Sequence, residues 1–155
     1  VAGANYPVVA DIKKHVYGKN KGNMEDKARV GSVYYNRGVV HGIITVEAIR
    51  KAQEKYGKGK ALTGEQMRWG FENLNLDDAR LKALGATGFM PPLKITCADH
   101  EGPGKVKFQQ WDGNKWNVVS DWIAPDWKLL RPIIEKSSLA YAKEKNVKVR
   151  QSIDD

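Results

Sequence analysis

The hydrophobic and polar positions in the first third of the chain predict two helices, with a loop and a short strand between them. Apolar residues recur at helical spacing over 5–17, and the glycine and polar residues of 18–26 are typical of a loop. Residues 29–35 are small and apolar and end in two tyrosines, which favours a strand. Asn36 suits the N-cap of the long amphipathic helix that follows. Its expected inward positions are Val39, Val40, Ile43, Val46, Ile49 and Ala52.

The middle of the chain predicts two shorter helices and a second strand. Thr63 and Gln66 have the spacing of a capping box, in which each side chain accepts a hydrogen bond from the other residue's backbone N–H at a helix start. Gly85 is placed to end the next helix. The apolar run over 93–97 predicts a strand, and a glycine-rich turn follows it.

The last third predicts a hairpin and a terminal helix. Apolar and polar residues alternate on both sides of Asp112-Gly113, a pair suited to a two-residue turn. The final helix is expected over about 127–145, with a kink or restart at Pro132. The order of elements indicates an α/β fold with too few strands for a doubly wound sheet. The sequence therefore predicts an incomplete part of a larger fold, with helices around a small sheet plus a β-hairpin.

Composition and charge narrow the function classes. The formal net charge is +8 in 155 residues, but the lysines are scattered and lie beside acidic residues. A nucleic-acid-binding protein would gather them into one stripe with interleaved aromatic residues, so the charge favours a solvated basic surface. No apolar run approaches the roughly 20 residues that span a bilayer. Because the chain begins at Val1 and shows no secretory signal, we expect a trimmed product or a piece of a longer chain.

The predicted junction between strand and helix carries the candidate binding residues Tyr34, Tyr35, Asn36 and Arg37. In open parallel sheets, ligands bind where strands lead into helices, and a helix N-terminus favours an anionic group. Tyrosine rings offer flat apolar faces, and an arginine offers a fork that matches a carboxylate. These residues suit a small organic acid or amino acid. The alternative is that the tyrosines pack against a neighbouring helix while Arg37 points to water.

Several segments together resemble a known family. "VYYNRGVVHGIITVEAIRKA" is similar to a Tyr-x-x-Gly…Glu-Ala-Ile segment, and "LTGEQMRWGFENL", "ITCADHEGPG" and "VKFQQWDGNKWNVVSDWI" follow in a similar order. The chain resembles periplasmic solute-binding proteins of branched-chain amino acid ABC transporters, the type 1 bilobed, leucine/isoleucine/valine-binding group. The resemblance covers nearly the whole chain and implies the C-terminal portion of such a protein.

The resemblance implies a division of the chain and a site. Residues 1–28 would form a helix and loop of the second lobe, 29–105 the late segment of the first lobe, and 106–155 the hinge hairpin and terminal helix of the second lobe. The family's ligand contact would fall on Tyr34 or Tyr35, with Asn36 adjacent. Arg37 has no usual counterpart in the family and rests on its chemistry alone.

The implied function is transport without catalysis. A solute-binding protein made with a signal peptide would act in the periplasm, close around an amino acid or aromatic acid, and deliver it to the permease of an ABC importer. It would need no cofactor, would not insert into the membrane, and as a fragment would self-associate to cover its apolar faces. Two alternatives stay open. One is a ligand-sensing receptor or regulatory domain of the same fold, and the other is a basic nucleic-acid-binding module.

One other group of residues could bind a metal or take part in catalysis. Cys97, Asp99 and His100 place three possible metal ligands within four residues, but zinc needs a fourth ligand at recognised spacing. A thiol–histidine nucleophile would also need an orienting partner that the sequence does not show. We therefore expect a turn, and neither a metal site nor a catalytic site. The five tryptophans are expected to serve packing.

Overall fold

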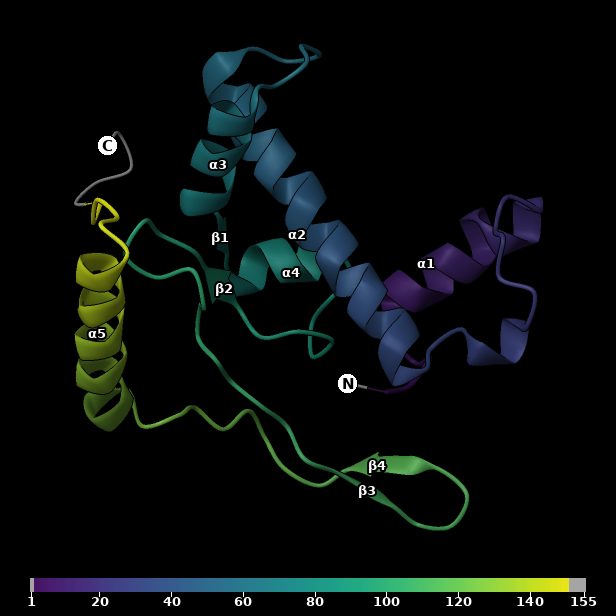
Figure 1. Ribbon diagram of the computed structural model, residues 1–155. Helices are drawn as coiled ribbons and strands as arrows, with labels where there is room; N and C mark the ends of the chain where they lie inside the picture. The colour runs from purple at the N-terminus through teal and green to yellow at the C-terminus, as the bar shows by residue number, and fades with distance from the viewer. Residues whose placement is uncertain (1, 151–155) are drawn as a thin grey trace.

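The computed structural model describes residues 2–150 and is a mixed α/β chain dominated by helices (Figure 1). Two antiparallel two-stranded sheets pair β1 with β2 and β3 with β4. The coarse α/β class is confirmed in this form, whereas two lobes are not. The elements are α1 (Pro7–His15), η1 (Tyr17–Lys19), η2 (Lys27–Arg29), α2 (Val33–Tyr56), α3 (Gly64–Glu72), β1 (Asn75–Leu76), α4 (Asp78–Ala83), β2 (Leu93–Lys94), β3 (Gln109–Trp111), β4 (Trp116–Val118) and α5 (Trp127–Glu144).

The strand predicted over 29–35 is wrong, because this segment turns into the start of α2. Gly31 has a φ of +98°, a left-handed conformation that ends any extended run. Ser32 is the N-cap of α2, and its Oγ accepts a hydrogen bond from the Tyr35 N–H at 3.3 Å. The apolar character of this segment instead reflects a buried turn, in which Val30 is only 6% exposed. Asn36 is therefore inside the helix and is not its cap.

The long helix α2 crosses α3, and this crossing is the main contact between helices (Figure 1). The predicted capping box starts α3: Gln66 N–H donates to Thr63 Oγ1 at 3.3 Å, and Thr63 N–H donates to Gln66 Oε1 at 3.0 Å. Gly70 of α3 is buried against the backbone of Ala48 in α2. A glycine here lets the two helices approach closely, which a side chain would prevent.

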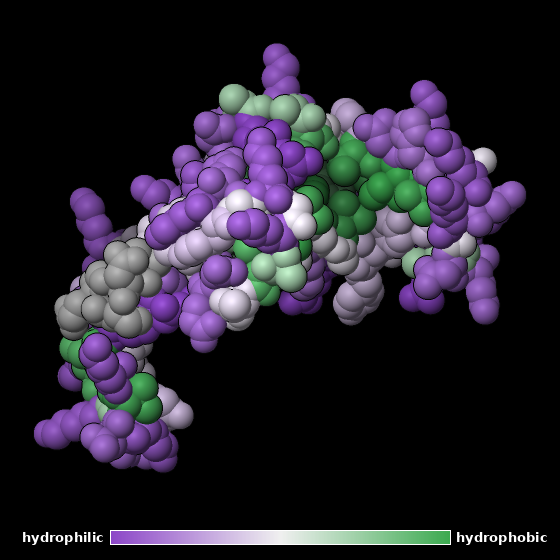
Figure 2. All heavy atoms as spheres, turned by 90° about the horizontal axis from the view of Figure 1, so that it is seen from above, coloured by the Kyte–Doolittle hydropathy of each residue, from purple (hydrophilic) through white to green (hydrophobic). Residues whose placement is uncertain are grey.

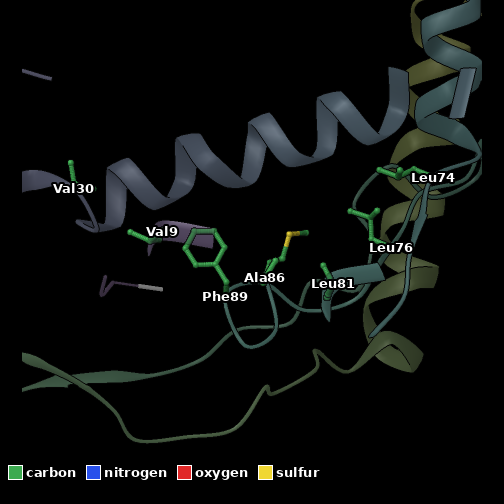
Figure 3. Close-up of a cluster of buried hydrophobic side chains, with 8 residues drawn as sticks. Val9, Val30, Leu74, Leu76, Leu81, Ala86 and Phe89 are labelled. Carbon is green, nitrogen blue, oxygen red and sulfur yellow. The ribbon is translucent and has the colours of Figure 1, made fainter. Parts of the chain in front are cut away.

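The hydrophobic core lies along one side of α2 (Figure 3). It draws one residue from α1 and one from the turn before α2, and the others come from the segment between α3 and β2. Of the inward positions predicted in α2, Ala52 is buried, but Val46 is 50% exposed and that assignment is wrong. The buried cluster consists of Val9, Val30, Leu74, Leu76, Leu81, Ala86, Phe89 and Met90.

The predicted hairpin is confirmed, although its loop is longer than two residues. Trp111 pairs with Trp116, so residues 112–115 form the connection. Asp112 shapes this loop because its Oδ1 accepts hydrogen bonds from the N–H groups of Asn114 and Lys115, both at 2.9 Å. The strand predicted over 93–97 is reduced to β2, since Thr96 turns the chain by pairing with Asp99.

The terminal helix is confirmed as α5, and Pro132 lies inside it without dividing it into two. Asp126 caps the helix by accepting from the N–H groups of Lys128 and Leu129 at 3.1 and 3.2 Å. Figure 1 shows α5 standing apart from the α2–α3–α4 body, and the β3–β4 hairpin projecting separately. Across residues 2–150, no helix has the length and apolar content needed to cross a membrane.

Candidate functional site

The four predicted binding residues lie in the first turns of α2 and point in different directions, because successive helix positions are about 100° apart. Tyr34 is 79% exposed. Tyr35 is half-buried with its ring 6.5 Å from that of Tyr17, and burial, aided by a hydrogen bond with Tyr17, raises the pKa of Tyr35 to about 12. Arg37 is exposed. The structure thus separates the two tyrosines that the sequence placed together, and ligand binding by this group stays a prediction.

Asn36 has a structural task. It is 1% exposed, and its Nδ2 donates to the carbonyl oxygens of Gly3 at 2.9 Å and Gly31 at 3.3 Å. The Gly3 N–H also donates to the Gly31 carbonyl at 2.8 Å. These bonds fasten the N-terminal segment to the start of α2. The buried amide stabilises the turn, because losing its hydrogen bond to the Gly3 carbonyl would cost about 1–3 kcal/mol.

One cavity is lined by a buried carboxylate that the sequence reasoning missed. This cavity has a volume of about 850 Å³ and lies between the C-terminal half of α2 and the β1–α4 segment. Glu47 is 8% exposed, and both of its oxygens accept from Arg80, from Nε at 2.6 Å and from Nη2 at 2.8 Å. Arg50 adds a contact at 3.3 Å. The signal that could have found it is a glutamate on the apolar side of α2, four residues after Ile43.

A second buried carboxylate joins three distant segments. Glu72 ends α3 with its side chain 1% exposed, and it accepts from Arg150 Nη1 and Nη2 at 2.6 and 2.7 Å. His100 Nε2 lies 3.0 Å from the same carboxylate. These groups adjoin a cavity of about 470 Å³ whose apolar wall is formed by Met67, Phe71 and Ile95. No sequence motif joins residues 72, 100 and 150, so this contact is visible only in the fold.

Another cavity, of about 700 Å³, lies between α5 and the turn that follows β2. Arg131 of α5 donates to Asp99 Oδ2 at 2.8 Å, and its guanidinium lies 4.8 Å from the ring centre of Trp127. The predicted cluster of Cys97, Asp99 and His100 is drawn apart by these pairings, since Asp99 faces Arg131 and His100 faces Glu72. Among residues 2–150 no group of three or more His, Cys, Asp or Glu side chains could hold a metal ion.

The Glu72 contact predicts a pH-dependent stability. Hydrogen bonds from Arg150 lower the pKa of the Glu72 carboxyl below its usual 4.5, although burial opposes them and His100 assists. The pKa of Glu72 is lower in the folded chain than in the unfolded chain. The ionised carboxylate therefore contributes its full stabilisation of the fold above about pH 4.5, and this contribution is lost as the pH falls through the folded-state pKa. We expect Glu72→Gln to lower the free energy of unfolding by about 2 kcal/mol at pH 6, and by progressively less as the pH falls below 4.5. Urea unfolding of both chains measures this, and a difference that is constant with pH would contradict it.

Comparison with known proteins gives one strong similarity. No protein-family model matches the chain, and no curated protein matches it. A crystal structure of an ABC transporter permease from the Pseudomonas fluorescens group is 47% identical and superposes with a TM-score of 0.93. The match covers 97% of this chain and 36% of the permease chain. The chain therefore spans about a third of the length of this solved protein.

This similarity corrects the resemblance drawn from the sequence. The solved neighbour is an ABC transporter permease, so the assignment to periplasmic solute-binding proteins is wrong, and so is the function derived from it. The sensory and nucleic-acid-binding alternatives gain no support. The motifs behind the resemblance were helix caps and turns, such as Thr63–Gln66 and Asp112–Gly113, which determine local structure and carry little information about function. The ABC transporter context itself is supported.

Proposed function

We propose that this chain works in an ABC transport system as part of its permease component. The observation that carries the proposal is the 47% identity over 97% of the chain, with a TM-score of 0.93, to the Pseudomonas permease. A TM-score of 0.93 means that the two backbones share the same fold over the matched residues. Because the chain spans only 36% of the permease, the proposed role belongs to the whole component and not to these residues alone.

We assign the chain a structural part in that component and no catalysis. Its two buried glutamates are each neutralised by an arginine, Glu47 by Arg80 and Glu72 by Arg150, at distances of 2.6–2.8 Å. A carboxylate held in a bidentate ion pair is a weak general base, since its charge is already stabilised. These two groups therefore serve the fold. We also propose that this part of the permease lies outside the cytoplasm, and that the transported solute is an amino acid or an aromatic acid.

Site-specific cross-linking in the native host tests the transport role. A photoreactive residue replaces Tyr34, which is 79% exposed, and Lys14 on the exposed face of α1 serves as a control position. Mass spectrometry then identifies the captured proteins. We expect capture of another subunit of the same ABC transporter. Capture only of proteins outside any ABC transporter would overturn the proposal.

A further inference from the structure

Helix α5 is fastened to the rest of the chain mainly at its two ends. Near its start, Arg131 pairs with Asp99 at 2.8 Å and approaches Glu101 at 3.6 Å. Beyond the C-terminal end of α5, Arg150 donates two hydrogen bonds to the Glu72 carboxylate. Between these points the helix covers little, because none of its 18 residues is buried. An amphipathic helix normally gains its stability by burying its apolar face, so this placement leaves the main source of stability unused.

The uncovered face of α5 is largely apolar. Spacings of three, four and eight residues place Leu129, Leu130, Ile133 and Tyr141 on one side of the helix, and we refer to them as the α5 stripe. Their exposed fractions run from 37% to 63%. Lys136 and Lys143 flank the Leu129 edge of this stripe, and Lys128 lies on another face of the helix. Figure 2 shows apolar side chains at the α5 end of the molecule, surrounded by hydrophilic ones.

The β3–β4 hairpin is uncovered in the same way, on both faces. Trp111 and Trp116 pair on one face with their rings 5.6 Å apart, and each is about half exposed. Phe108 and Val119, joined by a backbone hydrogen bond, are 58% and 56% exposed. A two-stranded hairpin is only marginally stable in water without a surface to pack on. Its main polar link to the body is Gln109, whose amide bonds the Ala2 N–H at 3.0 Å and the Ala2 carbonyl at 3.3 Å.

The total exposed surface indicates how much area a packing partner would have to bury. The chain exposes 10930 Å² at a mass of 17.4 kDa, whereas a compact monomer of this mass exposes about 7,900 Å². A standard interface between two proteins covers only about 800 Å² on each partner. The excess of roughly 3,000 Å² is thus several times larger than such an interface covers. The uncovered faces of α5 and of the hairpin lie at separate places, so covering both requires two regions of contact.

We propose that the α5 stripe and the β3–β4 hairpin pack against a complementary polypeptide, equivalent to the part of the Pseudomonas permease chain that this chain does not span. The unmatched part is 64% of that chain, large enough to cover both surfaces. This packing is of the kind found inside one protein, with a dry apolar centre, and the lysines beside the α5 stripe stay at its solvated rim. The inference rests on the shared fold and on the exposed apolar faces, and does not depend on the transport role.

A chimaera tests the proposal. The matched 36% of the Pseudomonas protein is replaced by this chain, and Ile133→Glu is compared in the chimaera and in the isolated chain. The control is Leu139→Glu on the polar side of the same helix, with an almost equal exposed fraction of 56% against 58%. In the chimaera we expect Ile133→Glu to lower the melting temperature by about 5 °C or more, because it buries an unpaired charge. Leu139→Glu in the chimaera, and Ile133→Glu in the isolated chain, are expected to change it by about 1 °C or less.

Equal effects of the two substitutions in the chimaera would overturn the proposal. So would an isolated chain that forms a stable dimer which Ile133→Glu dissociates, since the occupant would then be a second copy. If the chimaera does not fold, glutamate is placed instead at the two aligned positions of the Pseudomonas protein itself. The same difference between the two positions is expected there, and its absence would refute the inference.

Discussion

Replacing Gly70 with alanine is expected to lower the free energy of unfolding by about 2–3 kcal/mol. A Cβ at this position would overlap the carbonyl oxygen of Ala48 and would stand 3.0 Å from the Ala52 Cβ. Both neighbours belong to the buried face of α2, so relief requires α3 to move away from α2 and not a simple rotation of a side chain. Alanine is the better helix former by about 1 kcal/mol, and the overlap must exceed that gain for the net loss to appear.

The matched control is Gly42→Ala, also in a helix interior. Nothing lies within 4 Å of a Cβ at Gly42, so only the change in helix propensity acts there. We expect this substitution to raise the free energy of unfolding by about 0.5–1 kcal/mol. Urea unfolding followed by tryptophan fluorescence measures both variants; Trp69, one of the five tryptophans, has its ring 5.7 Å from that of Tyr56 across the α2–α3 crossing. A stabilised Gly70→Ala variant would show that the two helices adapt freely.

What the sequence could predict depends on the range over which each signal acts. Local signals were interpreted correctly where side-chain chemistry acts within a few residues, as in the Thr63–Gln66 capping box and the hairpin near Asp112. The segment 29–35 was misread because a buried turn and a buried strand share small apolar residues, and the φ of Gly31 is not visible in composition. Val46 was placed inward by periodicity, but the body covers α2 only on one side.

The candidate site depends even more on contacts between residues that are far apart in the sequence. The two buried carboxylates depend on partners that are distant in the chain: Glu47 pairs with Arg80, and Glu72 pairs with His100 and Arg150. No periodicity or motif predicts such pairs, because the fold alone brings them together. Conversely, the chemically attractive run from Tyr34 to Arg37 is adjacent in sequence but diverges around a helix. The predicted fragment of a bilobed fold is not confirmed; the structure shows short strands and a large exposed surface of 10930 Å².

Removing the arginine that neutralises Glu47 is expected to have the second large effect. Arg80→Met keeps the aliphatic stem but leaves a glutamate that is 8% exposed without its bidentate partner. Breaking a fully buried pair costs about 3–5 kcal/mol, and here Arg50 and the adjoining open cavity reduce the loss to about 2 kcal/mol.

The double variant Glu47→Leu/Arg80→Met is expected to be more stable than Arg80→Met alone, because no uncompensated charge stays buried. The backbone of α4 is unaffected in both variants, since its cap depends on the Arg80 N–H, which donates to Asp77 Oδ1 at 2.7 Å. A double-mutant cycle by urea unfolding measures the coupling. If the two substitutions changed the free energy of unfolding additively, Glu47 would be well solvated through the cavity. The ion pair would then contribute little to holding α4 against α2.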